Sequence, residues 1–222
     1  MIFVLEGTQR RQLHYYFDRM FRLRHQIFVK EQGWNLPSVN GRYEIDEYDG
    51  DDAVYLLDIT DDDIIQGSVR ITPSETCSLV ADYFPHLVEN GASPRSPLVH
   101  EATRYIFRPL SKRAEENRAA KARLLAAMME WCFVEQLSFL QCIVDMRVFP
   151  AWVELVPQTI PLGLPHPYAG GRTAPGGGEC IAFRWPVNEE VIEGIRAYGG
   201  MTADQPSVFG VGRSRKVAQA VH

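Results

Sequence analysis

The sequence predicts a mixed α/β (α+β) fold built as a single domain. Segments with the two-residue periodicity of strands predominate in the first half of the chain, and helical segments lie between them. The chain has 222 residues, of which 45% are hydrophobic and 23% charged, an ordinary globular composition. A chain of this length buries roughly 70% of its unfolded surface, so it can build a core without disulfides or a structural metal.

In the first half of the chain, the spacing of apolar residues defines the elements. Apolar residues three and four apart, from Leu13 to Ile27, predict an amphipathic helix capped by Thr8. Alternation predicts the strands, and the acidic residues 61–63 join two of them as a hairpin. In chain order we expect a strand at 2–6, the helix from Thr8, a loop from Gly33 to Gly50, strands at 53–60 and 64–72, an irregular segment at 73–97 and a strand at 99–107.

In the second half, capping and terminating residues mark the helices. Ser111 can cap a long helix whose apolar residues continue to about Phe139. Pro157 stops a short helix, and Asn188 caps a last one that Gly199 ends. In chain order we expect a helix at 111–139, a strand at 143–148, a helix at 150–156, a loop rich in Gly and Pro at 163–178, a strand at 180–186 and a helix at 188–199.

Charge and cysteine content exclude several classes of protein. Lys and Arg number 23 against 28 Asp and Glu, so no positive field favours nucleic acid. The four cysteines are far apart, which argues against a zinc site or redox motif and suits reduced thiols in the cytosol. The chain has neither a recognisable signal peptide nor a membrane-spanning apolar run. We therefore expect a cytoplasmic protein that binds neither nucleic acid nor membrane.

The loop at residues 31–50 carries most of the informative charges. Asp46 and Asp49 are three residues apart and converge if the segment makes one turn. Carboxylates beside the ring of Trp34 suit a positively charged ligand, because the ring face adds cation–π attraction. The alternative is a solvated acidic loop that binds nothing.

Two strands carry further candidates. Arg70 belongs to the site or projects to solvent. Glu101 and Arg104 point to opposite faces of a regular strand unless a bulge redirects one of them, and they can also form a structural ion pair. The run His100-Glu101-Ala102-Thr103-Arg104 lacks the second ligand of a zinc-protease motif, so no metal site is expected.

Charged and aromatic positions between residues 24 and 104 occur in a characteristic order. They are Arg24-x-x-x-Phe28-x-x-x-x-x-Trp34, Glu44-x-Asp46-x-x-Asp49, Gly67-Ser68-Val69-Arg70, Phe84 and Glu101-x-x-Arg104. This constellation resembles the acyl-homoserine-lactone (autoinducer) synthases of bacterial quorum sensing. The resemblance implies a GNAT-like fold, an αβα sandwich whose twisted, mostly antiparallel sheet has a V-shaped cleft between two central strands. It also implies a synthase domain over residues 1–200, while the mostly polar residues 201–222 are expected to form a loosely ordered tail.

The activity that the resemblance implies is an acyl transfer. An acyl group carried on coenzyme A or acyl carrier protein is joined to the amine of S-adenosylmethionine, after which a lactone closes and methylthioadenosine leaves. Both reactants are substrates, so neither a cofactor nor a metal is expected. The rivals are an N-acyltransferase acting on another amine and a ligand-sensing module without turnover.

The resemblance also assigns residues to roles. Glu101 is the expected base, directly or through one water, and Asp46 is its rival. Arg104 is expected to hold the methionine carboxylate, while Arg24 and Arg70 organise the site through ion pairs. The residues expected in catalysis are Glu101, Asp46, Arg70 and Arg104. Those expected to bind S-adenosylmethionine are Arg24, Phe28, Trp34, Asp46, Asp49, Phe84, Thr103 and Arg104, and those expected at the acyl donor are Ile143, Val144, Met146 and Trp152.

The chain departs from the family pattern in places that concern the acyl group. Thr103 stands where many members have Ser, and Tyr105 where Phe is usual. Residues 142–148 and 161–180 match poorly. The rings that follow residue 130 either fill the core or shorten the cleft for a short, branched or aromatic acyl group. The basic run at 108–123 is either a solvated face or a site that meets coenzyme A phosphates or an acidic carrier protein, with coenzyme A favoured.

Overall fold

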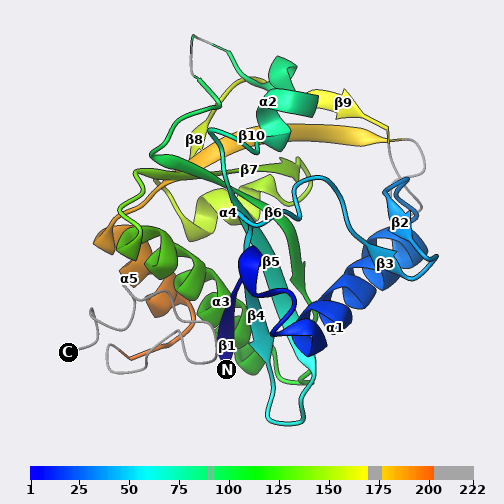
Figure 1. Ribbon diagram of the computed structural model, residues 1–222. Helices are drawn as coiled ribbons and strands as arrows, with labels where there is room; N and C mark the ends of the chain where they lie inside the picture. Colours follow the sequence, from blue (N-terminus) through cyan, green and yellow to red (C-terminus); the bar gives the residue numbers. More distant parts are fainter. Residues whose placement is uncertain (90, 92, 170–176, 203–222) are drawn as a thin grey trace.

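The computed structural model describes residues 1–89, 91, 93–169 and 177–202. Eight strands form one sheet in the order β1-β4-β5-β6-β7-β10-β8, with β9 also paired to β10, while β2 and β3 form a separate pair (Figure 1). The strands are β1 (Ile2–Glu6), β2 (Ser38–Val39), β3 (Tyr43–Glu44), β4 (Val54–Ile59), β5 (Ile65–Pro73), β6 (Val99–Phe107), β7 (Phe139–Asp145), β8 (Ile160–Pro161), β9 (His166–Tyr168) and β10 (Gly178–Pro186).

Helices cover both faces of the large sheet. The helices are α1 (His14–Arg24), α2 (Leu79–Tyr83), α3 (Ala114–Val134), α4 (Phe149–Leu155) and α5 (Glu189–Tyr198), with a π-helix η2 (His25–Glu31) and the 3-10 turns η1 (Gly7–Gln9) and η3 (Pro85–Leu87). Leu56 of β4 packs under α3 and α5, whereas its neighbours Tyr55 and Leu57 pack under α1. The expected αβα sandwich is therefore confirmed.

The sheet is split at its centre between β6 and β7. These two strands pair in parallel at three positions, from Val99 opposite Phe139 to Glu101 opposite Gln141. Beyond Glu101 both strands continue without pairing to each other, and they run apart in Figure 1. The other strand pairs among the described residues are antiparallel. The expected V-shaped cleft in a mostly antiparallel sheet is thus confirmed, and Glu101 lies at its apex.

A β-bulge in β6 redirects the side chains beyond the apex. Ser68 of β5 pairs with Ile106, but Arg70 pairs with Thr103, so β6 has one residue more than β5 over this stretch. Arg104 lies within it and takes the left-handed conformation, with a φ of 52°. As a result Arg104 stays on the face that Thr103 and Arg70 share, while Tyr105 packs with the core under α3. The bulge that the spacing of Glu101 and Arg104 required is therefore present.

Several expected element boundaries are confirmed. The hairpin of β4 and β5, the strand β6 and the last helix agree with expectation, and the Asn188 side chain accepts the Val191 N–H at 2.9 Å. Gly199 caps the end of that helix. Short elements in the expected loops, in the segment at 73–97 and after the short helix at 150–156 were missed, because elements of two to five residues leave no periodicity to find. These are β2, β3, β8, β9 and α2.

Two helix starts and one helix end were wrong. Thr8 belongs to η1, where Glu6 and Gln9 form a capping box, and α1 begins only at His14. Ser111 does not cap α3, which begins at Ala114. The same helix ends at Val134 because Gln136, with a φ of 60°, takes the left-handed conformation typical of helix ends. The following strand consequently begins earlier than expected.

Two other expectations concern the chain as a whole. Among the described residues, no helix combines the length and apolar character needed to cross a membrane. All four cysteines are free thiols. The division at residue 200 stays a prediction, since residues 203–222 lie outside the described part of the chain.

Candidate functional site

Six charged side chains meet on the α1 face of the sheet beside the split. We call them the six-charge cluster. Three are positive and three negative, and four separate segments supply them: the end of α1, the strand β3 with the loop after it, β5 and β6. The members are Arg24, Glu44, Asp46, Asp49, Arg70 and Arg104. The solvated acidic loop considered from the sequence is therefore wrong for these carboxylates.

The ion pairs run through the whole cluster. Arg24 binds Asp49 through both Nη atoms, at 2.7 and 2.9 Å. Arg70 contacts Asp49 at 3.0 Å and both oxygens of Asp46. Arg104 binds Asp46 at 2.8 Å and Glu44 at 2.9 Å. Glu44 also binds Arg24, so the ion pairs form a closed ring. Because every charge has an opposite neighbour, the cluster can remain largely buried.

Burial differs among the members in a way that separates their roles. The side chains of Arg24, Glu44, Asp49 and Arg70 are at most 1% exposed, whereas those of Asp46 and Arg104 are 6% and 9% exposed. The two less buried side chains also bind each other. A ligand that reaches the cluster from outside therefore meets Asp46 and Arg104, and the other four hold these two in place.

Strong electrostatic coupling keeps the buried groups ionised. Burial alone would raise the pKa of Asp49, but the Arg24 and Arg70 guanidinium groups hold it well below its usual range. Burial likewise opposes the charge of Arg70, and Asp49 and Asp46 outweigh it and raise the Arg70 pKa. The Tyr55 hydroxyl donates to Asp49 Oδ1 at 2.8 Å, and burial raises the Tyr55 pKa. These charges are therefore fixed at neutral pH.

One turn of the loop brings the two aspartates together, as their spacing predicted. The Asp49 N–H donates to the Asp46 carbonyl at 3.1 Å, and the Asp46 N–H donates to Asp49 Oδ2 at 2.9 Å. The Tyr48 N–H donates to Asp46 Oδ1 at 3.0 Å. The backbone itself thus orients both carboxylates.

An aromatic pair lies at the exposed edge of the cluster. Phe28, on the π-helix η2, stacks on Trp34 with ring centroids 5.5 Å apart. The Arg104 guanidinium lies 5.8 Å from the Phe28 ring centroid. Phe28 is buried, whereas Trp34 is 38% exposed and forms the outer wall. The expected grouping of both rings with the charged loop is present.

Glu101 lies apart from the cluster, at the apex of the split. Its carboxylate accepts hydrogen bonds from the Ser78 hydroxyl at 2.8 Å and the Gln141 amide at 3.0 Å, and also from the Val80 N–H. Burial raises its pKa, against the opposing effect of these donors. The alternative of a structural ion pair with Arg104 is wrong, because Arg104 binds Glu44 and Asp46 instead.

The remaining expected residues are distributed around the split. The Thr103 hydroxyl accepts from Arg70 Nε at 2.9 Å, which ties it to the cluster. Phe84, at the end of α2, packs with the apolar group around Val80, on the side of β7 and β10. Ile143 packs with that same group, whereas Val144 packs under α3. Neighbouring residues of β7 thus face opposite layers.

Two of the residues expected at the acyl donor lie beyond the end of β7. Met146 is half-buried and follows the strand directly. Trp152, on α4, meets the Tyr105 ring edge-on with centroids 5.5 Å apart. Through this contact β6, on one side of the split, packs against α4, the helix that follows β7 on the other side.

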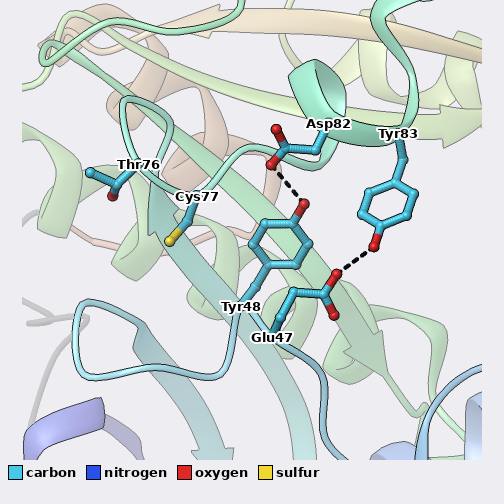
Figure 2. Close-up of a pocket in the computed structure, with 6 residues that line it drawn as sticks. All are labelled: Glu47, Tyr48, Thr76, Cys77, Asp82 and Tyr83. Atoms are coloured by element: carbon cyan, nitrogen blue, oxygen red, sulfur yellow. Dashed lines mark hydrogen bonds between the residues drawn. The ribbon is translucent and has the colours of Figure 1, made fainter.

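An acidic pocket of about 550 Å³ opens next to the cluster. Figure 2 shows the Tyr48 hydroxyl donating to Asp82, at 2.8 Å, and the Tyr83 hydroxyl directed at Glu47. The pocket adjoins the cluster because the Arg70 guanidinium lies 5.6 Å from the Tyr48 ring centroid. Its lining residues are Glu47, Tyr48, Thr76, Cys77, Asp82 and Tyr83.

Sequence reasoning missed the residues that hold the site together. Glu44 stood within the quoted motif but received no role, although it binds both Arg24 and Arg104. Ser78 and Gln141 fix Glu101 from segments that carry no motif. For these three residues, the only signal in the sequence was the spacing of Glu44 from Asp46.

Comparisons with known proteins show what the sequence and the fold are similar to. The sequence matches the family described as Autoinducer synthase over residues 8–150. It is 32% identical over 166 residues to the isovaleryl-homoserine lactone synthase of Bradyrhizobium diazoefficiens, covering 74% of this chain and 73% of that protein. An acyl-homoserine-lactone synthase of Rhizobium etli is 24% identical over 194 residues, covering 87% of each chain.

The fold is similar to that of a solved structure. It is that of a CoA-dependent acyl-homoserine lactone synthase with SAM and isopentyl-CoA. The TM-score is 0.77 at 28% identity, covering 100% of this chain and 98% of that one. The expected GNAT-like fold is confirmed.

Proposed function

Since this chain belongs to the autoinducer synthase family, we propose that its six-charge cluster binds S-adenosylmethionine and that the split between β6 and β7 receives the acyl thioester. The chain is an acyl-homoserine-lactone synthase, an acyltransferase that makes a quorum-sensing signal from S-adenosylmethionine and an acyl donor.

The observation that carries the proposal is the partial exposure of Asp46 and Arg104 beside the stacked rings of Phe28 and Trp34. S-adenosylmethionine bears an ammonium, a sulfonium and a carboxylate. Asp46 can bind the cationic groups and Arg104 the carboxylate, while the rings attract the sulfonium and exclude water. The acidic lining of the adjoining pocket suits the same cation. Arg24, Glu44, Asp49 and Arg70 act as positioning residues.

The acyl transfer needs a deprotonated amine next to the thioester. The amine nitrogen attacks the thioester carbonyl, the carbon–sulfur bond breaks, and the thiol leaves with a proton. Glu101 is our candidate for the base, directly or through one water, because it lies where the strands part and its raised pKa brings it closer to neutral pH. Asp46 is the rival base, since it lies within the cluster.

Ring closure completes the reaction. The methionine carboxylate oxygen attacks the methionine side-chain carbon that is bonded to the sulfonium. The bond between that carbon and sulfur breaks, and methylthioadenosine leaves. Orientation of the carboxylate by Arg104 favours this internal displacement. Neither step is an oxidation or a reduction, and the proposed reaction therefore requires no redox cofactor. A cytoplasmic location fits the proposal because free thiols are usual in reducing compartments.

Coenzyme A is the proposed carrier of the acyl group. Four basic residues are exposed around the connection from β6 to α3 and can meet its phosphates: Arg108, Lys112, Arg113 and Arg118. One relative is named an isovaleryl-homoserine lactone synthase, and the solved structure of a CoA-dependent synthase holds isopentyl-CoA, so the names of both point to a compact, branched group. The rings of Tyr105 and Trp152 support a compact group here, because they narrow the space behind the split. An acidic carrier protein is the alternative partner of the basic residues.

One assay separates the proposed reaction from its rivals. The purified protein is incubated with S-adenosylmethionine and a panel of acyl groups, each on coenzyme A and on carrier protein, and methylthioadenosine is quantified. The synthase releases methylthioadenosine, most rapidly with a compact acyl-CoA. An N-acyltransferase acting on another amine would release thiol without methylthioadenosine, and a sensing module would release neither.

A further inference from the structure

The hydroxyl of Tyr105 is buried and has no hydrogen-bond partner among the described residues. Such a group is uncommon, because a buried hydroxyl without a partner loses its bonds to water and gains nothing in return. Burial also raises the Tyr105 pKa, so the phenol stays protonated and available as a donor. Packing alone does not require this oxygen, since Phe would place the same ring there.

The bulge places this hydroxyl on the side of the sheet away from the six-charge cluster. Arg104 binds Asp46 on one face, and Tyr105, the next residue, packs with the core on the other. Its ring touches Trp152 of α4, which follows the opposite arm of the split. Tyr105 therefore lies behind the opening through which the acyl group must extend from the amine.

Lys121 of α3 supplies a second donor at the same place. Its Nζ lies 4.7 Å from the Trp152 ring centroid, and burial lowers its pKa. No carboxylate among the described residues forms an ion pair with it. Lys121 and Tyr105 both line a pocket of about 410 Å³ between η2, β6 and α3, whose other charged residues are Glu31 and Arg108. Around this tryptophan, the Tyr105 hydroxyl thus lacks an acceptor and the half-buried Lys121 ammonium lacks an ion-pair partner in the described part of the chain.

We propose that Tyr105 and Lys121 are specificity residues that select an acyl group with a hydrogen-bond acceptor oxygen at its far end, a ketone or a carboxylate. The inference rests on the proposed function, because it assumes that the acyl group enters through the split. A purely hydrocarbon acyl group leaves both donors unpaired. A site built to hydrogen-bond its substrate discriminates strongly against an analogue that lacks the bonding atom.

The test uses acyl-CoA thioesters of one shape that differ only in the terminal group. The first set is 5-methylhexanoyl-, 5-oxohexanoyl- and glutaryl-CoA, and the second is 7-methyloctanoyl-, 7-oxooctanoyl- and pimeloyl-CoA. Each is assayed with S-adenosylmethionine for methylthioadenosine release. We expect kcat/KM for an oxygen-bearing member to exceed that of its methyl analogue by about tenfold or more in at least one set. Comparison of the ketone thioester with the carboxylate thioester shows whether the site prefers a neutral or an anionic terminal group.

Two variants connect the preference to these residues. Tyr105→Phe and Lys121→Met should each bring the oxygen-to-methyl ratio of kcat/KM towards one, because each removes one of the two donors. Tyr105→Phe should also leave Tm unchanged or raise it, because the Tyr105 hydroxyl bonds none of the residues that the structure describes. Tyr55→Phe is the matched control, since the Tyr55 hydroxyl binds Asp49 and its loss should lower Tm.

The outcomes are distinguishable. A wild-type preference for the methyl analogue in both sets overturns the inference, as does an unchanged ratio in both variants, and either result leaves the synthase activity standing. If no thioester in the panel yields methylthioadenosine, the proposed function fails and the inference fails with it.

Discussion

Asp46 and Asp49 lie three residues apart in one turn, yet they face different surroundings. Asp49 is enclosed by Arg24, Arg70 and Tyr55, whereas Asp46 keeps some exposure beside Arg104. Asp46→Asn should weaken S-adenosylmethionine binding by roughly 2 kcal/mol or more with little loss of stability. Asp49→Asn should instead cost about 3–5 kcal/mol of unfolding free energy, because it removes the one carboxylate that the buried guanidinium groups of Arg24 and Arg70 share. Calorimetric titration and urea unfolding of both variants measure the two quantities, and equal stability loss in both would contradict the division.

The difference in unfolding free energy between the wild type and Asp49→Asn should disappear at low pH. The pKa of Asp49 is lowered by folding, so its contribution is present above the unfolded value of about 3.9 and is lost as pH falls through the folded value. The gap in unfolding free energy should therefore be full at pH 7 and shrink below about pH 4. Urea unfolding across that pH range measures it, and a constant gap would contradict the assigned shift.

Glu101 is a general base or only an anchor for α2, and the pH dependence of its variants separates these roles. Because folding raises its pKa, kcat/KM should rise with pH through a value above that of an ordinary glutamate. Glu101→Gln should lower kcat/KM by about 10²–10⁴-fold and remove that acid limb. Ser78→Ala, which removes one hydrogen bond to Glu101, should retain the limb. A limb that persists in Glu101→Gln would transfer the role to Asp46.

The same shift has a consequence for stability, with the opposite sign to that of Asp49. A carboxyl whose pKa is raised by folding favours the native state below the unfolded value, and this contribution is lost as pH rises through the folded value. Glu101→Gln should therefore show a weaker decline of stability with rising pH than the wild type does. This comparison serves as a control that the variant removes the titrating group without unfolding the chain.

At the scale of elements, the bulge in β6 makes the site possible. It lets Arg104 and Thr103 share a face, at the cost of a left-handed conformation at Arg104. Arg104→Gly and Arg104→Ala both remove the guanidinium and should both abolish activity. Only Gly takes this conformation freely, so Arg104→Gly should be more stable than Arg104→Ala by about 1 kcal/mol. Equal stability in thermal unfolding would mean that the bulge imposes no strain.

The sequence revealed elements whose residues repeat and missed contacts that depend on distant segments. Strand β6 and the hairpin before it stood out by alternation, and the Asn188 cap by its position. A left-handed Arg104 was not predictable, because its own residue type disfavours that conformation. Its binding to Glu44, 60 residues earlier, follows from the tertiary fold alone.

Much of the candidate site was predictable for a different reason. The order of Arg24, Phe28, Trp34, Asp46 and Asp49 preserves a family pattern, and the structure brings these residues together. The pattern could not separate ligand-facing from positioning residues, since that depends on small differences in burial. It also could not locate Tyr105 behind the split, because the bulge decides which face that side chain takes.

In the molecule as a whole, the sites proposed for the two substrates lie on opposite sides of one opening. The six-charge cluster lies on the α1 face of the sheet, and Tyr105 and Trp152 lie under α3 and α4. The apex of the split, where Glu101 binds Gln141, keeps the two strands joined. This arrangement couples acyl transfer to lactone formation, because the amine and the sulfonium belong to one bound molecule.

The most direct measurement is the balance of products from the purified protein. With S-adenosylmethionine and a compact acyl-CoA, mass spectrometry should find free coenzyme A, methylthioadenosine and acyl-homoserine lactone in equal amounts. All three should disappear when either substrate is omitted, and should fall together in Asp46→Asn. Coenzyme A released without methylthioadenosine and lactone would contradict the account, because the chain would then acylate something other than S-adenosylmethionine or merely hydrolyse the thioester.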